Sequence, residues 1–288
     1  TSSEWYTGSS AVRVSGSGSS WTVGSMHIGF TGSSSLLIEN GGSVYSGDSE
    51  VGLSSASDSE ITVTGDGSSW TNGLGSMRVG YWGAGEVNVQ HGGTVSTTGH
   101  AFFGYWREPG TEVFGYGKLS VSGGNSTFEA NDLWISFYGN GDLSVEDGGV
   151  VKSVNGNFGG SFRASGHAVI SGLGSRWEVE NVLSMGYYQT TESRIDILDG
   201  GRVTQSSAFI GRVADSSGRV TVSGEGSSWA SAQWTFVGYE GEGELTLENG
   251  ATHTSTTGIV ASELGSVGTA VVTGAGTAWN NAGTMTVG

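Results

Sequence analysis

Residues 77–95 read MRVGYWGAGEVNVQHGGTV, and this stretch holds one unit of a repeat that runs along the chain. The unit has three phrases: an apolar triplet that ends in glycine (78–80), an alternating apolar pair (Val87 and Val89) and a GGxV close at Val95. Apolar residues that alternate with a period of two predict a strand with one buried face. The glycines and the neighbouring polar residues supply tight corners, because they tolerate the backbone angles that corners need.

The same phrases recur throughout the chain, and they come in two alternating forms. The triplets are centred on Ile28, Val51, Val79, Phe103, Ile135, Phe158, Met185, Ile210, Val237, Val260 and Val287, at short intervals of 23–25 residues that alternate with long ones of 27–32. Short units close on valine, whereas long units close on a tryptophan phrase such as VTGDGSSW (63–70). Each tryptophan therefore takes the place that valine fills in the next unit.

This equivalence predicts that the repeated tryptophans are buried. The predicted core ladder comprises Trp70, Trp177, Trp229 and Trp279, with Phe128 in the tryptophan place of one long unit. His253 takes the valine place of one short unit, and we expect it to be a core histidine with satisfied hydrogen bonds. Buried aromatic residues contribute about 3–5 kcal/mol each relative to alanine. The alternative is an exposed aromatic strip that binds sugars.

A unit of about 26 residues cannot bury its apolar face alone, but stacked units can. The repeat predicts an all-β fold, a right-handed parallel β-solenoid (β-helix) of about ten to eleven rungs with three short strands each. The competing architecture is a β-propeller, which needs longer antiparallel strands and leaves the half-period unexplained. We expect residues 1–288 to form a single solenoid fragment cut from a longer array, because neither end has the polar cap that solenoids need.

Composition narrows the possible partners. The 288 residues include 54 glycines, one proline and no cysteine, but also ten Trp, nine Tyr and ten Phe, which argue against a disordered linker. The net charge is −16 with only 11 Lys and Arg, so nucleic acid and anionic membrane surfaces are not expected as partners. Without cysteine the chain forms no disulfide and no thiolate metal site.

The repeat also resembles a known family. Residues 77–95 and FVGYEGEGELTLENGA (236–251) resemble the glycine-rich repeats of bacterial autotransporter passenger domains of the AIDA and antigen-43 type. They also resemble the related repeat of PEP-CTERM-associated surface proteins. The resemblance covers essentially the whole chain and implies a β-solenoid on the extracellular bacterial cell surface. It implies outer-membrane attachment only through a barrel missing from this chain, and a role in adhesion, autoaggregation or biofilm formation.

The residues after each triplet supply the candidate binding surface. On three successive rungs the second of these residues is Trp82, Trp106 or Tyr138, which we expect to face outward and to stack about 5 Å apart. Exposed aromatic ladders suit sugar faces or another protein. Arg107 and Glu108 open the longest insertion of the repeat and are added as candidate contacts, because projecting loops tend to hold specific contacts. The alternative is a corner patch covered by its own loops.

No catalytic or metal-binding constellation stands out. Acidic residues follow the apolar pair in several short units, but they recur on alternate rungs roughly 10 Å apart, which is too far to share a calcium ion. A glycosidase needs two facing carboxylates, and the five histidines form no spaced pair. We therefore predict no catalytic residue, no metal and no cofactor, and we expect the chain not to be an enzyme.

These observations lead to one expected function and two alternatives. We expect an adhesin or a self-association passenger domain whose partners are copies of itself on neighbouring cells, or host and surface glycans or proteins. The first alternative is a passive structural stalk that displays another domain. The second is a solenoid that binds or degrades polysaccharide, such as a tailspike.

Overall fold

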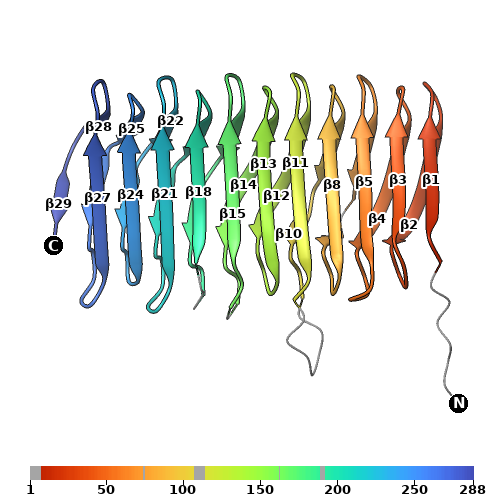
Figure 1. Ribbon diagram of the computed structural model, residues 1–288, viewed down its shortest axis with the longest axis horizontal. Coiled ribbons are helices and arrows are strands. Elements are labelled where there is room, and N and C mark those ends of the chain that lie inside the picture. The colour runs from red at the N-terminus through yellow and green to blue at the C-terminus, as the bar shows by residue number, and fades with distance from the viewer. Residues whose placement is uncertain (1–7, 74, 107–113, 162, 189–191) are drawn as a thin grey trace, which may run out of the picture.

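The computed structural model describes residues 8–73, 75–106, 114–161, 163–188 and 192–288, which form an elongated parallel β-solenoid of about eleven turns (Figure 1). The described residues contain no helix. Each turn gives one strand to an 11-stranded sheet, here sheet A, whose strands pair in parallel and in chain order. These strands are β1 (Ser10–Ser15), β3 (Ser34–Glu39), β5 (Asp58–Thr64), β8 (Ala84–Gln90), β11 (Tyr116–Ser122), β13 (Asn140–Glu146), β15 (Gly166–Ser171), β18 (Ser193–Leu198), β21 (Ser217–Ser223), β24 (Glu242–Glu248) and β27 (Val267–Thr273).

The rest of each turn runs along the opposite side of the solenoid and forms sheet B, with 18 strands. These are β2 (Ser20–Ile28), β4 (Ser43–Val51), β6 (Ser69–Asn72), β7 (Met77–Val79), β9 (Thr94–Thr97), β10 (His100–Phe103), β12 (Thr127–Ile135), β14 (Val150–Phe158), β16 (Arg176–Val179), β17 (Val182–Met185), β19 (Arg202–Gln205), β20 (Ser207–Ile210), β22 (Ser228–Ser231), β23 (Trp234–Val237), β25 (Thr252–Ser255), β26 (Thr257–Val260), β28 (Ala278–Asn281) and β29 (Met285–Val287). The predicted parallel solenoid is confirmed.

The number of strands in a turn differs from the prediction in part. Seven turns have the predicted three strands, but in four turns the two strands of sheet B join into one strand of nine residues: β2, β4, β12 and β14. In these four turns seven residues separate the closing apolar residue from the next triplet centre, as from Trp21 to Ile28. From Trp70 to Val79 the separation is nine. Both ends of that segment stay in register with the neighbouring turn, so its extra residues leave the ladder. The spacing alone does not decide the division, because β19 and β20 are separate strands although Ile210 follows Val203 by seven positions.

The repeated aromatic residues line the core of the solenoid. Trp70, Trp177 and Phe128 are fully buried, and Trp229 is 1% exposed. Each pairs in register with a smaller residue on the adjacent turns: Trp177, for example, lies between Val151 and Val203. Trp279, in the last turn, is half-buried and packs against the same core. The alternation of large and small residues fills the interior without stacking one indole on another.

Each of the buried core tryptophans Trp70, Trp177 and Trp229 also has an acceptor for its indole N–H, which the sequence did not lead us to expect. Trp70 Nε1 donates to Ser46 Oγ (2.9 Å), Trp177 Nε1 to Ser153 Oγ (3.1 Å) and Trp229 Nε1 to Gln205 Oε1 (3.0 Å). In every case the acceptor belongs to the preceding turn, two residues after the residue that pairs with the tryptophan. A buried donor without a partner costs about 1–3 kcal/mol, so each tryptophan depends on this polar neighbour.

His253 confirms the expectation of a core histidine with satisfied hydrogen bonds. It is fully buried and stacks on Trp229, with ring centroids 4.4 Å apart and planes 23° apart. Its Nδ1 donates to the Trp229 carbonyl oxygen (2.9 Å), and its Nε2 lies 3.1 Å from Thr235 Oγ1. Burial lowers the pKa of His253 to about 4, so the ring is neutral at physiological pH.

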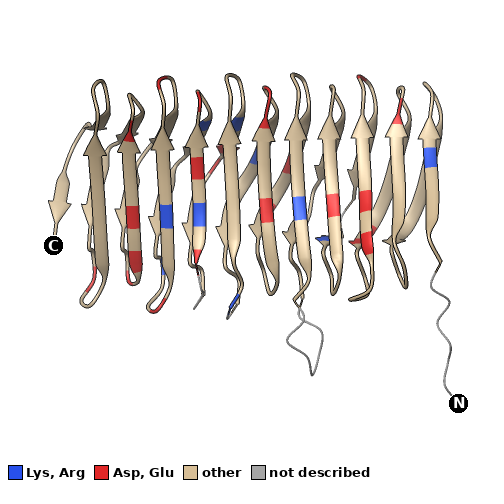
Figure 2. Cartoon of the chain, viewed as in Figure 1, with Lys and Arg blue, Asp and Glu red and all other residues tan. Residues whose placement is uncertain are grey.

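The outer face of sheet A is polar. Figure 2 shows acidic and basic residues distributed over many strands of this face, and several form ion pairs, such as Lys118 with Glu86 (2.7 Å). Asp196 is the most buried of these acids. Burial alone would raise the pKa of Asp196, but hydrogen bonds from His167 and Arg194, together with their charges, hold it below its usual range.

Candidate binding surface

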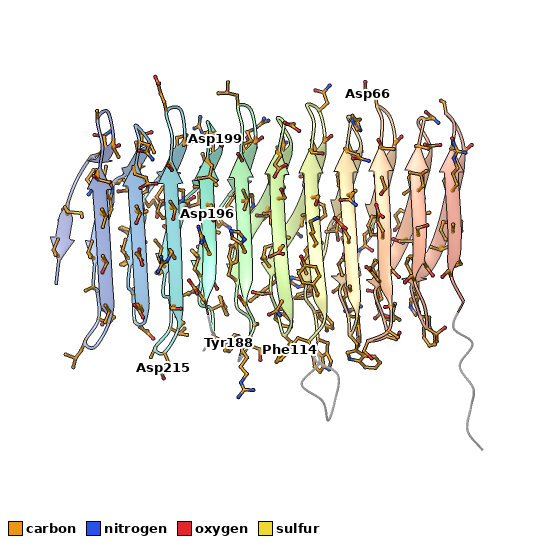
Figure 3. The ribbon with its side chains drawn as sticks, in the orientation of Figure 1. Asp66, Phe114, Tyr188, Asp196, Asp199 and Asp215 are labelled. Carbon is orange, nitrogen blue, oxygen red and sulfur yellow. The ribbon has the colours of Figure 1, made fainter. Side chains whose placement is uncertain are left out.

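A continuous cluster of aromatic side chains lies where each turn passes from sheet B to sheet A. Figure 3 shows this corner as the lower edge of the solenoid, where Tyr188 and Phe114 are labelled. We call the cluster the aromatic band, and its members are Tyr81, Trp82, Phe102, Tyr105, Trp106, Trp134, Phe137, Tyr138, Tyr187 and Tyr188. Tyr188 is exposed and the other nine side chains are half-buried, since each ring covers part of the next. The band extends from the third turn to the seventh.

The three predicted site residues all lie in the band, but only two of them touch. Trp106 and Tyr138 have ring centroids 4.7 Å apart. Trp82 instead contacts Tyr81 (5.2 Å), and its indole Nε1 is buried without a hydrogen-bond partner among the described residues. All three side chains are half-buried, so they face solvent less fully than expected. Arg107 and Glu108 lie outside the described residues.

The first residue of each pair joins the band as well. Tyr81 contacts Tyr105 (5.2 Å), and Tyr105 stacks on Phe137 with centroids 5.8 Å apart and planes 15° apart. These residues are partly packed at the corner. They form the inner layer against which Trp106 and Tyr138 rest.

Sequence reasoning missed a third row of the band. Phe102 and Trp134 precede the buried triplet centres Phe103 and Ile135, so strand alternation directs them outward. Both pack on Phe137, with centroid distances of 4.7 and 5.1 Å. The signal was present in the sequence, because the residue before each triplet centre is polar in some turns and aromatic in others.

Two arginines lie against the band, and their environments differ. The Arg78 guanidinium lies 5.3 Å from the Tyr105 ring and pairs with Asp48 (3.3 Å) and Glu50 (3.4 Å). The Arg212 guanidinium lies 4.7 Å from the ring of Tyr187 and donates to Ser184 Oγ (2.6 Å), but it has no carboxylate partner among the described residues. It also lies 5.1 Å from Phe209, which continues the aromatic surface onto β20 and β23.

A hollow of about 300 Å³ opens beside Arg212. It is lined by Asp132, Trp134, Asn155, Asn157, Val182, Tyr187 and Arg212. The ring centroids of Trp134 and Tyr187 lie 5.0 Å apart, although the two residues belong to the fifth and seventh turns. The contact is possible because the sixth turn carries the small residues Asn157 and Gly160 at the equivalent positions. A Cβ at Gly160 would lie 2.3 Å from Phe137 Cδ2, so a larger residue cannot fit under that ring.

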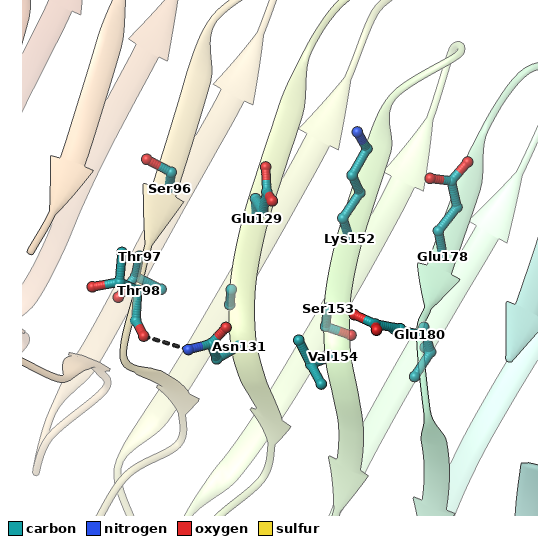
Figure 4. A pocket seen from close by; sticks show the side chains of 12 residues that line it. Ser96, Thr97, Thr98, Glu129, Asn131, Lys152, Ser153, Val154, Glu178 and Glu180 are labelled. Atoms are coloured by element: carbon teal, nitrogen blue, oxygen red, sulfur yellow. Dashed lines mark hydrogen bonds between the residues drawn. The ribbon is translucent and has the colours of Figure 1, made fainter. Parts of the chain in front are cut away.

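A larger and more open groove lies at the bend between the two parts of sheet B. It has a volume of about 570 Å³, and its lining includes Glu129, Asn131, Lys152, Glu178 and Glu180. Figure 4 shows Lys152 between Glu129 and Glu178, on three neighbouring strands. The carboxylates are largely exposed and no aromatic ring lines the groove, so its chemistry is that of an ordinary polar face.

The acidic and polar corners opposite the band adopt turn geometry. Asn40, His91, Asp147, Asp199 and Asn249 have positive φ angles of 51–57° and precede glycines that also have positive φ. This is the geometry of a tight two-residue turn, which Asn, Asp and Gly favour. The described residues contain no group of three or more His, Asp or Glu placed to hold a metal ion, and no helix long and apolar enough to cross a membrane.

Comparison with known proteins gives one distant match. No family model matches the chain, and no curated protein matches it. A solved structure, that of the TibC-catalyzed hyper-glycosylated TibA55-350 fragment, aligns with 98% of this chain and 97% of its own, at 16% sequence identity and a TM-score of 0.31. A similarity this distant carries no argument about family or activity.

Proposed function

We propose that this solenoid is an adhesive or self-associating passenger domain on the outside of a bacterial cell, and that the aromatic band is its main contact surface. The observation that carries the proposal is the band itself. It places ten aromatic rings along one edge, and nine of them are half-buried, in part by one another. Large aromatic side chains dominate binding surfaces because they bury much apolar area at low entropic cost.

The repeat architecture supports this role. A rigid parallel core holds the band straight, so several rings can meet a long partner at once, and weak contacts can add by avidity. The resemblance to autotransporter passenger repeats gives the cellular setting: an extracellular surface on which neighbouring cells, or host proteins and glycans, are the partners. Both the setting and the partners belong to the proposal.

The net charge of −16 determines how self-association is expected to depend on salt. Two copies of the chain repel each other at long range, while their aromatic bands attract only on contact. Salt shortens the screening length from about 10 Å at 0.1 M to about 3 Å at 1 M. Self-association through the band is therefore expected to strengthen as salt is raised, whereas adhesion through ion pairs would weaken.

Surface display tests the proposal. The chain, fused to an outer-membrane anchor on a non-clumping bacterium, is expected to cause sedimentation of the cells or retention on glycan- or protein-coated surfaces. Cells that display an intact rod but neither clump nor adhere would favour the passive stalk. Release of reducing sugar from a panel of polysaccharides by the purified chain would favour the degrading solenoid instead.

A further inference from the structure

We propose that the hollow beside Arg212 is a binding site for the carboxylate-bearing sugar ring of an acidic polysaccharide, a hexuronate unit. The site is separate from the predicted residues Trp82, Trp106 and Tyr138, although it lies at the far end of the same aromatic band. The inference rests on the proposed function only in assuming that this edge of the solenoid meets a partner.

The Arg212 guanidinium is held in place and has N–H groups free to bind an anion. The two aromatic rings of Tyr187 and Phe209 hold its guanidinium in place, and one nitrogen is fixed by Ser184. No carboxylate of the described residues pairs with it, in a chain where acids outnumber Lys and Arg by 27 to 11. A planar guanidinium with free N–H groups is suited to bind a carboxylate through two hydrogen bonds.

Asn157 adds an accessible amide to the lining of the hollow. Its side chain is only 5% exposed, lines the hollow and makes no side-chain hydrogen bond to the described residues. Its amide atoms are not among the fully enclosed polar atoms that lack a partner, so they stay accessible to a ligand in the hollow. A sugar hydroxyl in the hollow would give this amide both a donor and an acceptor.

The rest of the lining selects a sugar over other anions. Trp134 and Tyr187 form an aromatic wall, and one face of a pyranose ring carries the C–H groups that pack on such rings. Asp132 also lines the hollow, but its carboxylate is held by His100 (2.8 Å) and Asn155 (2.7 Å). Its remaining lone pairs can accept from sugar hydroxyls. The volume of about 300 Å³ is at the lower limit for ligand sites and suits a single ring of a chain that continues outside.

Calorimetric titration of the purified chain with a trigalacturonate probe tests the proposal. We expect saturable binding that weakens at least tenfold when the probe is replaced by its methyl ester, which keeps the sugar and removes the charge. Arg212→Gln is expected to weaken binding of the acid at least tenfold, and Trp134→Ala to weaken both probes. Arg219→Gln is the matched control, since it removes the same charge from the ion pair with Glu244 on sheet A (2.9 Å) and should leave binding within twofold.

Three results would overturn the assignment. They are the absence of saturable binding, equal binding of acid and ester, or equal effects of the Arg212 and Arg219 substitutions. Concentration-dependent self-association that Arg212→Gln abolishes, without binding of trigalacturonate, would show that a carboxylate from a second copy fills the hollow instead. Clumping of displayed cells is measured separately, so loss of the sugar site leaves the proposed adhesive function standing, and failure to clump leaves the sugar site testable.

Discussion

Two groups of tryptophans among the described residues differ in their surroundings. Trp70, Trp177 and Trp229 close long units, are buried in the core and donate their N–H to a polar residue of the preceding turn. Those around the triplets, such as Trp106 and Trp134, are half-exposed and rest on other aromatic rings. The same repeat therefore places one residue type in two environments, the core and the corner between the sheets.

The difference also shows how each group is constrained. A core indole must match the size of its neighbours and find an acceptor, so its partners Val151, Val203 and Ser153 are as important as the indole itself. A ring of the band needs only an adjacent ring and space, which Gly160 provides beneath Phe137. We therefore expect core substitutions to change stability and band substitutions to change binding.

The largest expected effect comes from truncating a core indole. Trp177→Ala should lower the free energy of unfolding by about 3–5 kcal/mol, because it leaves a cavity and the unpaired hydroxyl of Ser153. Trp134→Ala removes an indole of the same size from the band and should cost only about 1–2 kcal/mol. Denaturant unfolding followed by circular dichroism measures both, and equal losses would contradict the division between core and band.

His253 gives the next largest effect, and it depends on pH. Its pKa is about 4 in the folded chain against an ordinary value of 6.5, so below pH 6.5 the unfolded chain takes up a proton that the folded chain refuses. The difference in unfolding free energy between wild type and His253→Val should therefore be constant above pH 7. Between pH 6.5 and pH 4 the wild type should lose roughly 3 kcal/mol of stability relative to the variant. A difference that stays flat over this window would show that the ring is not buried in its neutral form.

A smaller loss is expected from removing the acceptor of a core indole. Ser153→Ala leaves Trp177 Nε1 buried without a partner and should destabilise the chain by about 1–3 kcal/mol. Ser144→Ala, on the exposed face of sheet A, loses only a hydrogen bond to Glu146 and should change stability by less than about 0.5 kcal/mol. Equal unfolding midpoints for the two variants would contradict the claim that the hydrogen bond to Ser153 stabilises the buried indole.

Much of the fold follows from the sequence because the repeat imposes it ten times over. The parity of Val87 and Val89, and the exchange of Trp70 for Val95, are enough to place the core without a structure. The joined strands β2, β4, β12 and β14 were not predicted, because the spacing that they share also occurs in divided turns such as that of β19 and β20. The composition of the band was predicted only in part, because contacts such as Trp134 with Tyr187 cross a whole turn and depend on the small size of Gly160 and Asn157.

The central claim is that the outward aromatic residues bind a partner while the inward ones hold the fold. The most direct test is the double variant Trp82→Ala/Trp106→Ala, measured for cell clumping on surface display and for its unfolding midpoint as a purified chain. Trp234→Ala is the matched control, since it removes an indole that is 48% exposed but lies outside the band. The account predicts that the double variant loses clumping with an unfolding free energy within about 1–2 kcal/mol of wild type, while the control still clumps. Undiminished clumping by the folded double variant, or equal loss in the control, would contradict it.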